Sequence, residues 1–210
     1  MENEDEGTHA VYFNRGVAGS QAYARKFGNR RPDQVPDREA FRWLSRGLFK
    51  AMLDFIAQAD SDRFGLRASV YEFRQGAVLK AFRKAADKGA DVKIIFDDRQ
   101  VINEKNPEKS KVQPSMQNRE GIETFDLEDM VIPRRADGNA ISHNKFIILL
   151  ENGKPVQVWT GSTNMTDGGI FGHSNVGHIV RDPDVAAKYL EYWEHLKDDP
   201  AMARKEADDQ

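Results

Sequence analysis

The sequence contains no cysteine in 210 residues. Disulfide bonds, thiolate metal ligands and cysteine nucleophiles are therefore excluded. Long hydrophobic runs are also missing, because no apolar stretch approaches the roughly 18 residues of a membrane-spanning helix. The first residues, Met1–Gly7, are acidic, whereas a secretory signal begins basic and then turns apolar. We therefore expect no export signal and a cytoplasmic location.

Charge of one sign is not in large excess, since the formal net charge is −3. This balance argues against a strongly basic nucleic-acid coat but leaves room for a local basic channel. A hydrophobic fraction of 39% and a charged fraction of 31% are typical of a soluble globular protein. The length suits one domain, which we expect over residues 9–198, between an acidic tail (1–8) and a charged tail (199–210).

Hydrophobic periodicity predicts an α/β fold. Helices are expected over residues 37–59, 78–86 and 183–196, strands over 66–73, 92–96, 122–127 and 175–180, and a long loop over 15–37. The helix between strands 66–73 and 92–96 implies a parallel, right-handed crossover. We expect a mixed, mostly parallel central sheet flanked by helices on both faces.

Two polar motifs adjoin apolar runs near the end of the chain. Ser142-His143-Asn144-Lys145 precedes the run 146–150, and Gly161-Ser162-Thr163-Asn164 follows the run 156–159. The turn signal at 151–154 predicts that the two runs form a β-hairpin. His143 and Lys145 point the same way because strand side chains alternate, and a buried lysine requires a counter-charge, which a bound phosphate supplies.

His-x-Lys followed by Gly-Ser-x-Asn resembles the signature of the phospholipase D superfamily. Residues 68–97 are similar to the first β-α-β unit of that family, and the resemblance covers roughly residues 40–197. It implies an enzyme that cleaves phosphodiesters without a metal or another cofactor.

By this resemblance, His143 attacks phosphorus and forms a phosphohistidine. Lys145 and Asn164 contact the phosphoryl oxygens. Ser162 either assists these contacts or orients His143. Residue types fit these roles, since histidine is a nucleophile near neutral pH and lysine and amide groups stabilise developing charge.

Further residues are expected to contact the substrate. They are Gly161, Thr163, Arg134, Arg135 and Glu72. The two arginines either attract phosphate or pair with acidic neighbours, namely Asp126, Glu128 or Asp129. Glu72 can alternatively replace a carboxylate that orients the histidine.

The sequence departs from the family pattern at two positions. Leu150 stands where the family usually has an aspartate, five residues after the lysine. Gly177 stands where the family often has a glutamate that helps to orient the histidine. The first departure is expected to be structural, whereas the second removes a group from the site.

A basic segment lies upstream of both motifs. Arg25, Lys26, Arg30 and Arg31 are interleaved with Tyr23 and Phe27. Such a segment either tracks a nucleic-acid backbone and stacks bases or is a solvated loop.

Only one of the five histidines, His143, lies in a His-x-Lys context that a Gly-Ser-x-Asn segment follows, whereas the family reaction uses two such motifs. The resemblance therefore implies a homodimer with the site at its two-fold axis, or one half of a tandem protein. Nucleic acid is the favoured substrate. The alternatives are a phospholipase D-type lipid hydrolase or transphosphatidylase, and a degenerate binding or dimerisation module.

Overall fold

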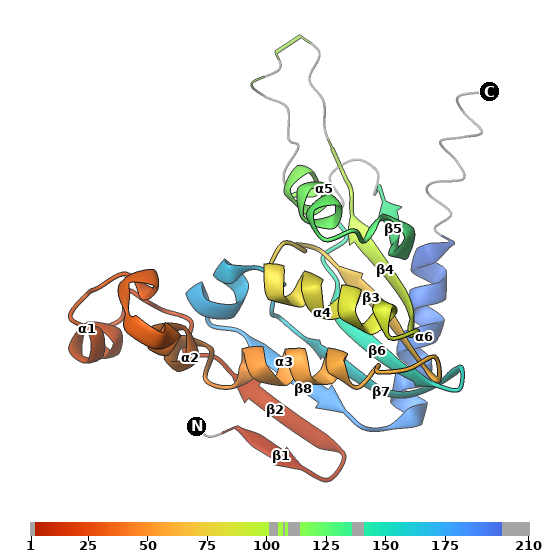
Figure 1. Cartoon of the computed structure of the whole chain (residues 1–210), viewed down its shortest axis with the longest axis horizontal. Helices are drawn as coiled ribbons and strands as arrows, with labels where there is room; N and C mark the ends of the chain where they lie inside the picture. The colour runs from red at the N-terminus through yellow and green to blue at the C-terminus, as the bar shows by residue number, and fades with distance from the viewer. Residues whose placement is uncertain (1–2, 101–104, 107, 109–113, 136–140, 199–210) are drawn as a thin grey trace.

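A computed structural model describes residues 3–100, 105–106, 108, 114–135 and 141–198. Its centre is a mixed sheet of eight strands (Figure 1). In spatial order the strands are β1 (Glu4–Glu6), β2 (His9–Phe13), β8 (Val176–Val180), β7 (Lys154–Gly161), β6 (Lys145–Glu151), β3 (Phe64–Val70), β4 (Asp91–Asp97) and β5 (Val131–Arg134).

The α/β class and the mixed sheet confirm the prediction, but the sheet is mostly antiparallel rather than mostly parallel. Within the described residues, β3–β4 and β4–β5 are the parallel pairs. The other five pairs are antiparallel. Parallel pairing follows from the helical crossovers after β3 and β4, whereas the hairpin and the strands beyond β7 reverse direction each time.

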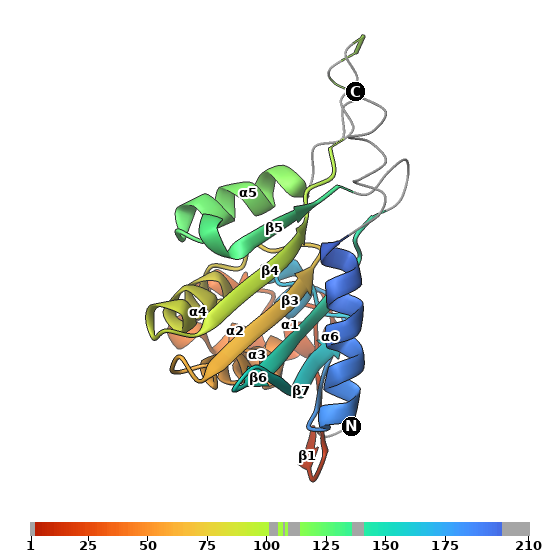
Figure 2. The same cartoon turned by 90° about the vertical axis from the view of Figure 1, so that its right-hand side faces the viewer.

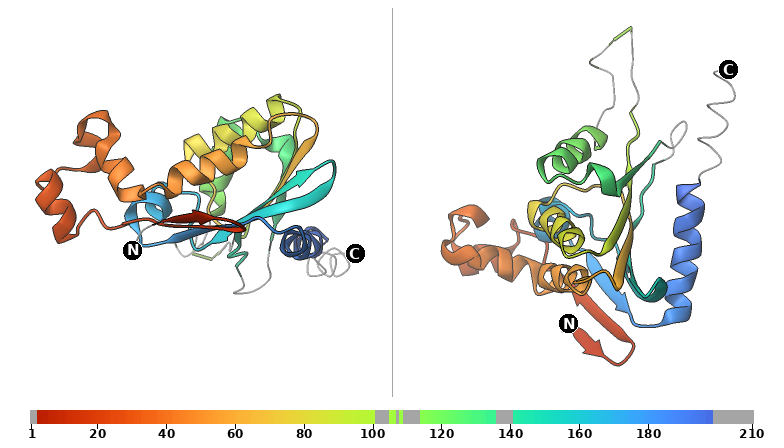
Figure 3. Two further views of the ribbon diagram at one scale, coloured as in Figure 1. Left: turned by 90° about the horizontal axis from the view of Figure 1, so that it is seen from below. Right: turned by 45° about the vertical axis from the view of Figure 1, so that its right-hand side comes forward.

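Helices cover both faces of the sheet, as predicted. They are α1 (Gln21–Phe27), α2 (Glu39–Ser45), α3 (Leu48–Ala57), α4 (Gly76–Asp87), α5 (Ser115–Thr124) and α6 (Pro183–Lys197). Figure 3 shows α3 and α4 on one face and α6 on the other, and Figure 2 shows α6 running along the strands.

The alternation of β6 separates two hydrophobic cores. Ile147 and Leu149 belong to the larger core under α3 and α4. Ile148 and Leu150 belong to the smaller core under α6. The indole of Trp193 fixes α6 to the sheet by donating to the Ala68 carbonyl at 2.8 Å.

The β6–β7 hairpin has the predicted turn. Asn152 and Gly153 both have positive φ, 49° and 75°, which is the backbone of a type I′ turn. This turn places the first residue of β6 beside the last residues of β7, so both polar motifs lie at the same end of the sheet.

One predicted element near the middle of the chain is wrong. Residues 122–127 are not a strand, because α5 continues to Thr124. Ile122 is buried together with Ser115 and Asn118 at helical spacing. The strand of this region is β5, which follows a short 3-10 turn at Glu128–Met130.

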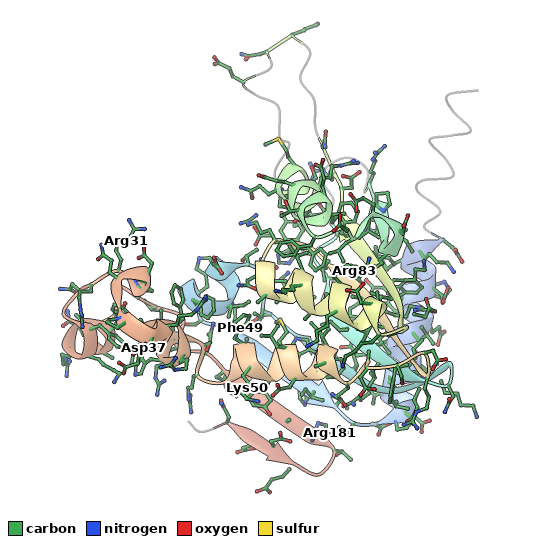
Figure 4. All side chains as sticks on the ribbon, in the orientation of Figure 1. Arg31, Asp37, Phe49, Lys50, Arg83 and Arg181 are labelled. Carbon is green, nitrogen blue, oxygen red and sulfur yellow. The ribbon has the colours of Figure 1, made fainter. Side chains whose placement is uncertain are left out.

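The segment before α3 is more ordered than a loop. It contains α1 and two 3-10 turns, Pro32–Gln34 and Pro36–Arg38, and projects from the sheet with Arg31 and Asp37 on it (Figures 1 and 4). The single helix predicted from Asp37 is two helices, because Arg46 and Gly47 take positive φ between α2 and α3.

The acidic N-terminus is exposed but is not simply a tail. Glu4–Glu6 pairs with β2 as an edge strand. Three consecutive carboxylates on an edge discourage pairing with another chain. Asp5 also accepts hydrogen bonds from Tyr12 and Arg181, at 2.7 and 2.6 Å.

Candidate functional site

Strand direction assembles the site. β6 runs antiparallel to both neighbours, so its first residue lies beside the last residues of β3 and β7. Lys145 is paired with Val70, and Phe146 with Thr160. The His-x-Lys motif, the Gly-Ser-x-Asn motif and the residues after β3 therefore meet at one end of the sheet.

His143 lies just before β6, with its ring 4.7 Å from the ring of Tyr71 in an edge-on arrangement. No hydrogen bond joins this ring to another described residue. Burial lowers the pKa of His143 and the Lys145 charge lowers it further, against smaller opposing effects of Glu72 and Asp97. The imidazole is therefore neutral, and able to act as a nucleophile, at a lower pH than an ordinary histidine.

Lys145 is half-buried, and its Nζ donates to the His143 carbonyl at 3.0 Å. The same Nζ lies 5.4 Å from the centre of the Tyr71 ring. Burial lowers the pKa of Lys145 to about 8, although Glu72 opposes this shift. An anion bound at this point would raise the lysine pKa again and offset the cost of burying its charge, in line with the counter-charge expected from the sequence.

Gly161 and Ser162 form a rigid corner between β7 and β8. Gly161 has φ 146°, and a Cβ there would lie 2.2 Å from the Val176 carbonyl oxygen, so glycine is required. The Ser162 hydroxyl donates to Asn175 Oδ1 at 2.9 Å and accepts from the Val176 amide at 3.1 Å. Ser162 is thus fixed by β8 and has no contact with the His143 ring.

Thr163 is a correction to the predicted substrate-binding set. Its side chain is buried, and its hydroxyl donates to the Val176 carbonyl at 2.9 Å. The side chain therefore braces the corner and cannot reach a substrate.

Asn164 and Glu72 are brought together by backbone pairing. The amide of Met165 donates to the Glu72 carbonyl, and the Arg74 amide donates to the Met165 carbonyl, both at 3.1 Å. Asn164 Nδ2 then donates to Glu72 Oε2 at 2.5 Å, while its buried Oδ1 has no partner. Glu72 also pairs with Arg74 at 3.1 Å.

Glu72 does not contact the histidine as the sequence reasoning proposed. Its carboxylate orients the Asn164 amide and acts on His143 and Lys145 only through its charge. The histidine-orienting position itself has no room for a carboxylate, because a Cβ on Gly177 would lie 2.2 Å from the Trp159 ring. The indole of Trp159 occupies the space that a side chain at 177 needs.

Leu150, which stands where the family usually has an aspartate, has the structural role that the sequence predicts. It is buried near the far end of β6, paired with Gly65 and Pro155, in the core under α6. An aspartate there would lose hydration with no gain at the site.

Arg134 and Arg135 contact neighbours other than those predicted. Arg134 donates to the buried Ser142 hydroxyl at 2.5 Å. Arg135 pairs with Asp98 at 2.9 Å, and the Asp98 side chain is completely buried. Arg134 thus holds Ser142, the residue before His143, whereas Arg135 is held at the end of β4 and its side chain remains 61% exposed.

Sequence reasoning missed two groups around His143. Tyr71 contacts both His143 and Lys145 from the end of β3. Asp97, at the end of β4, is buried and accepts the Ser142 amide at 2.9 Å, which anchors the turn before His143. The carboxyl ends of parallel strands were the available signal, because side chains there gather at one edge.

The upstream basic segment does not offer rings for stacking. Tyr23 and Phe27 are buried and pack against Trp43. Lys26 pairs with Glu39 at 2.9 Å, and Arg31 pairs with Asp33 at 3.2 Å.

A cleft of about 420 Å³ opens beside the His-x-Lys motif, between the hairpin and α6. Its lining consists of His143, Asn144, Lys145, Phe146, Thr160, Gly161, Lys188, Tyr189 and Tyr192. Substrate can therefore approach the histidine and the lysine from the α6 side.

The family described as "Cardiolipin synthase, PLD-like domain" matches residues 52–197, which contain both motifs and the β3–α4–β4 unit. The chain belongs to the phospholipase D superfamily. The match starts within α3 and ends with α6, so this superfamily domain contains every residue of the site.

Solved structures support the same fold. Nuc from Salmonella typhimurium, a phospholipase D family member, is 25% identical with a TM-score of 0.52, over 70% of this chain and 85% of that one. NucT from Helicobacter pylori is 18% identical with a TM-score of 0.51, over 72% and 88%. Phosphatidylserine synthase from Haemophilus influenzae is 12% identical with a TM-score of 0.51, over 72% and 35%. A comparison with curated proteins gives no significant match.

Within the ranges that the structure describes, no group of three or more histidine, aspartate or glutamate side chains is arranged to hold a metal ion. None of the helices in the same ranges is long and apolar enough to cross a membrane.

Proposed function

We propose that this chain hydrolyses the phosphodiester bonds of nucleic acid through a covalent intermediate on His143, without a metal ion. The observation that carries the proposal is the meeting of an imidazole with a lowered pKa, a half-buried lysine and a half-buried amide at one end of the sheet. Membership of a superfamily of phosphodiester-processing enzymes supports it.

In the first step a nitrogen of His143 attacks phosphorus, forming a P–N bond as the P–O bond to the leaving group breaks. Lys145 and the Asn164 amide hold the oxygens on which charge develops. A proton must reach the leaving oxygen, and we assign it to a second copy of His143. In the second step that histidine takes a proton from water, which attacks phosphorus and releases the phosphate product from His143.

The second copy comes from a homodimer or from another half of a tandem protein. This chain spans 85% and 88% of the lengths of Nuc and NucT, but 35% of the phosphatidylserine synthase. Similarity in length to the two small relatives favours the homodimer.

Nucleic acid is favoured over lipid by the lining of the cleft. Two lysines and three aromatic residues, Phe146, Tyr189 and Tyr192, line it, and no aliphatic side chain does. Lysines beside aromatic rings are the combination that contacts the phosphates and bases of single-stranded nucleic acid. The competing reading is a module that binds without turnover, and the absence of a carboxylate at Gly177 favours that reading over a lipase.

The test is cleavage of a single-stranded oligonucleotide and of bis-p-nitrophenyl phosphate in the presence of a chelator. We expect turnover that His143→Ala lowers at least about a thousand-fold. His173→Ala is the matched control, because that side chain is exposed outside the cleft. Unchanged cleavage by His143→Ala would exclude the mechanism, and oligonucleotide binding without cleavage would support the binding module.

A further inference from the structure

We propose that the cleft between the hairpin and α6 binds the base of the nucleotide next to the scissile phosphate, with Tyr192 as the stacking surface. This inference rests on the proposed function and specifies the substrate. It assigns a role to α6, which carries none of the motif residues.

The position of Tyr192 relative to the histidine carries the argument. Its hydroxyl donates to Asn144 Oδ1 at 3.3 Å, and Asn144 is the residue between His143 and Lys145. Tyr192, His143 and Lys145 also line the same cleft, so a base on the Tyr192 ring would belong to a nucleotide next to a phosphate at His143. The contact also fixes one end of the ring.

Exposure distinguishes Tyr192 from the other aromatic residues of the cleft. Tyr192 is 46% exposed, and it is the one aromatic residue among the large exposed apolar side chains of the described chain. Tyr189 instead packs edge-on against Phe146 with ring centres 5.1 Å apart, and its hydroxyl donates to Thr160 at 3.1 Å. Tyr189 and Phe146 thus form a fixed support. Tyr192 packs against Phe146 with ring centres 6.0 Å apart and leaves the rest of its ring exposed to a ligand.

The charges of the cleft match a nucleotide. Lys145 lies at one side and Lys188 at the other, and the Lys188 side chain is 80% exposed with Glu191 at 2.9 Å. A flat aromatic base between two phosphates uses both the tyrosine ring and the lysines. An acyl chain uses neither.

Tyr192→Ala tests this assignment on two substrates with the same backbone. One is a single-stranded oligothymidine, and the other is an oligonucleotide of equal length made of abasic residues. We expect Tyr192→Ala to lower kcat/KM on oligothymidine by about 5- to 100-fold, the range of base–aromatic stacking, and to leave the abasic substrate within about two-fold. Tyr192→Phe keeps the ring and should stay near wild type on both.

Val185→Ala is the matched control, because Val185 is exposed on the same helix but does not line the cleft. Equal losses on both substrates, or no loss on either, would overturn the stacking role. A change in solution mass for Tyr192→Ala would also overturn it and assign the ring to a contact between copies.

A binding measurement separates failure of the proposed hydrolysis from failure of the stacking role. If the wild type cleaves neither oligonucleotide, the affinities of wild type and Tyr192→Ala for the same two molecules are compared by fluorescence anisotropy. A preference of the wild type for oligothymidine that Tyr192→Ala removes would keep the subsite, and equal affinities would reject it.

Discussion

At the residue scale, Lys145, to which we assign the phosphate contact, shows how such a group costs stability. Burial holds its pKa near 8, so below that pH its charge is present in the folded state at a cost. The unfolded chain holds the same proton up to the ordinary value of 10.5. The contribution of Lys145 to the free energy of unfolding is therefore lowest below pH 8 and rises between about pH 8 and pH 10.5.

Lys145→Met should accordingly stabilise the protein while removing activity. The thioether keeps most of the buried stem and removes the charge, so we expect about 1 kcal/mol at pH 7 after allowance for solvent screening. Urea unfolding at pH 7 and pH 10 measures the effect, which should shrink at the higher pH. A destabilised variant at pH 7 would mean that the hydrogen bond to the His143 carbonyl outweighs burial.

The same two shifts set the pH dependence of the reaction. A neutral His143 is needed for attack, and its pKa is lowered from 6.5, so the acid limb of kcat/KM should lie below 6.5. In the proposed mechanism a charged Lys145 holds the phosphate and the second copy of His143 must carry the proton for the leaving group, so the alkaline limb should lie no higher than about 8. The profile of kcat/KM reports the free enzyme, in which these pKa values apply.

Glu72 supplies an internal check on that profile. Its charge raises the pKa of Lys145 and of His143. Glu72→Gln keeps an acceptor for Asn164 and removes the charge, so both limbs should move to lower pH. A fall in kcat with unmoved limbs would show that Glu72 acts through Asn164 alone.

At the scale of elements, α5 holds the end of the sheet where the site lies. Asn118 is fully buried, accepts the Phe73 amide at 2.8 Å, and donates to the carbonyls of Tyr71 and Asp97 at 2.8 and 3.0 Å. One side chain thus joins α5 to the ends of β3 and β4.

Asn118→Ala should destabilise the protein by about 3 kcal/mol, because three buried backbone groups lose their partner. Thermal or urea unfolding measures the loss, and Met116→Ala on the exposed side of α5 should change little. A loss below about 1 kcal/mol would mean that water replaces the amide.

The sequence alone predicts the helices and strands that carry the motifs, but it does not predict the elements around them. The hairpin, the β3–α4–β4 unit and α6 have strong local signals, such as the Asn152-Gly153 turn and Pro183 in the first turn. The helix α5 was missed because its burial depends on polar residues, Ser115 and Asn118, whose partners come from other strands. For the same reason, Tyr71 and Asp97 enter the site through strand pairing, which no local pattern specifies.

At the scale of the whole molecule, the chain has one His-x-Lys motif that a Gly-Ser-x-Asn segment follows, so the proposed mechanism takes its proton donor from a second copy. If two copies of His143 share each site, a dimer with one altered chain is inactive. Wild type mixed with equal His143→Ala, refolded together, should then retain roughly a quarter of the activity of the same total amount of wild type. Independent sites would instead retain roughly half. Light scattering on the same samples must show a dimer, and a monomer with full activity would remove the need for a second histidine.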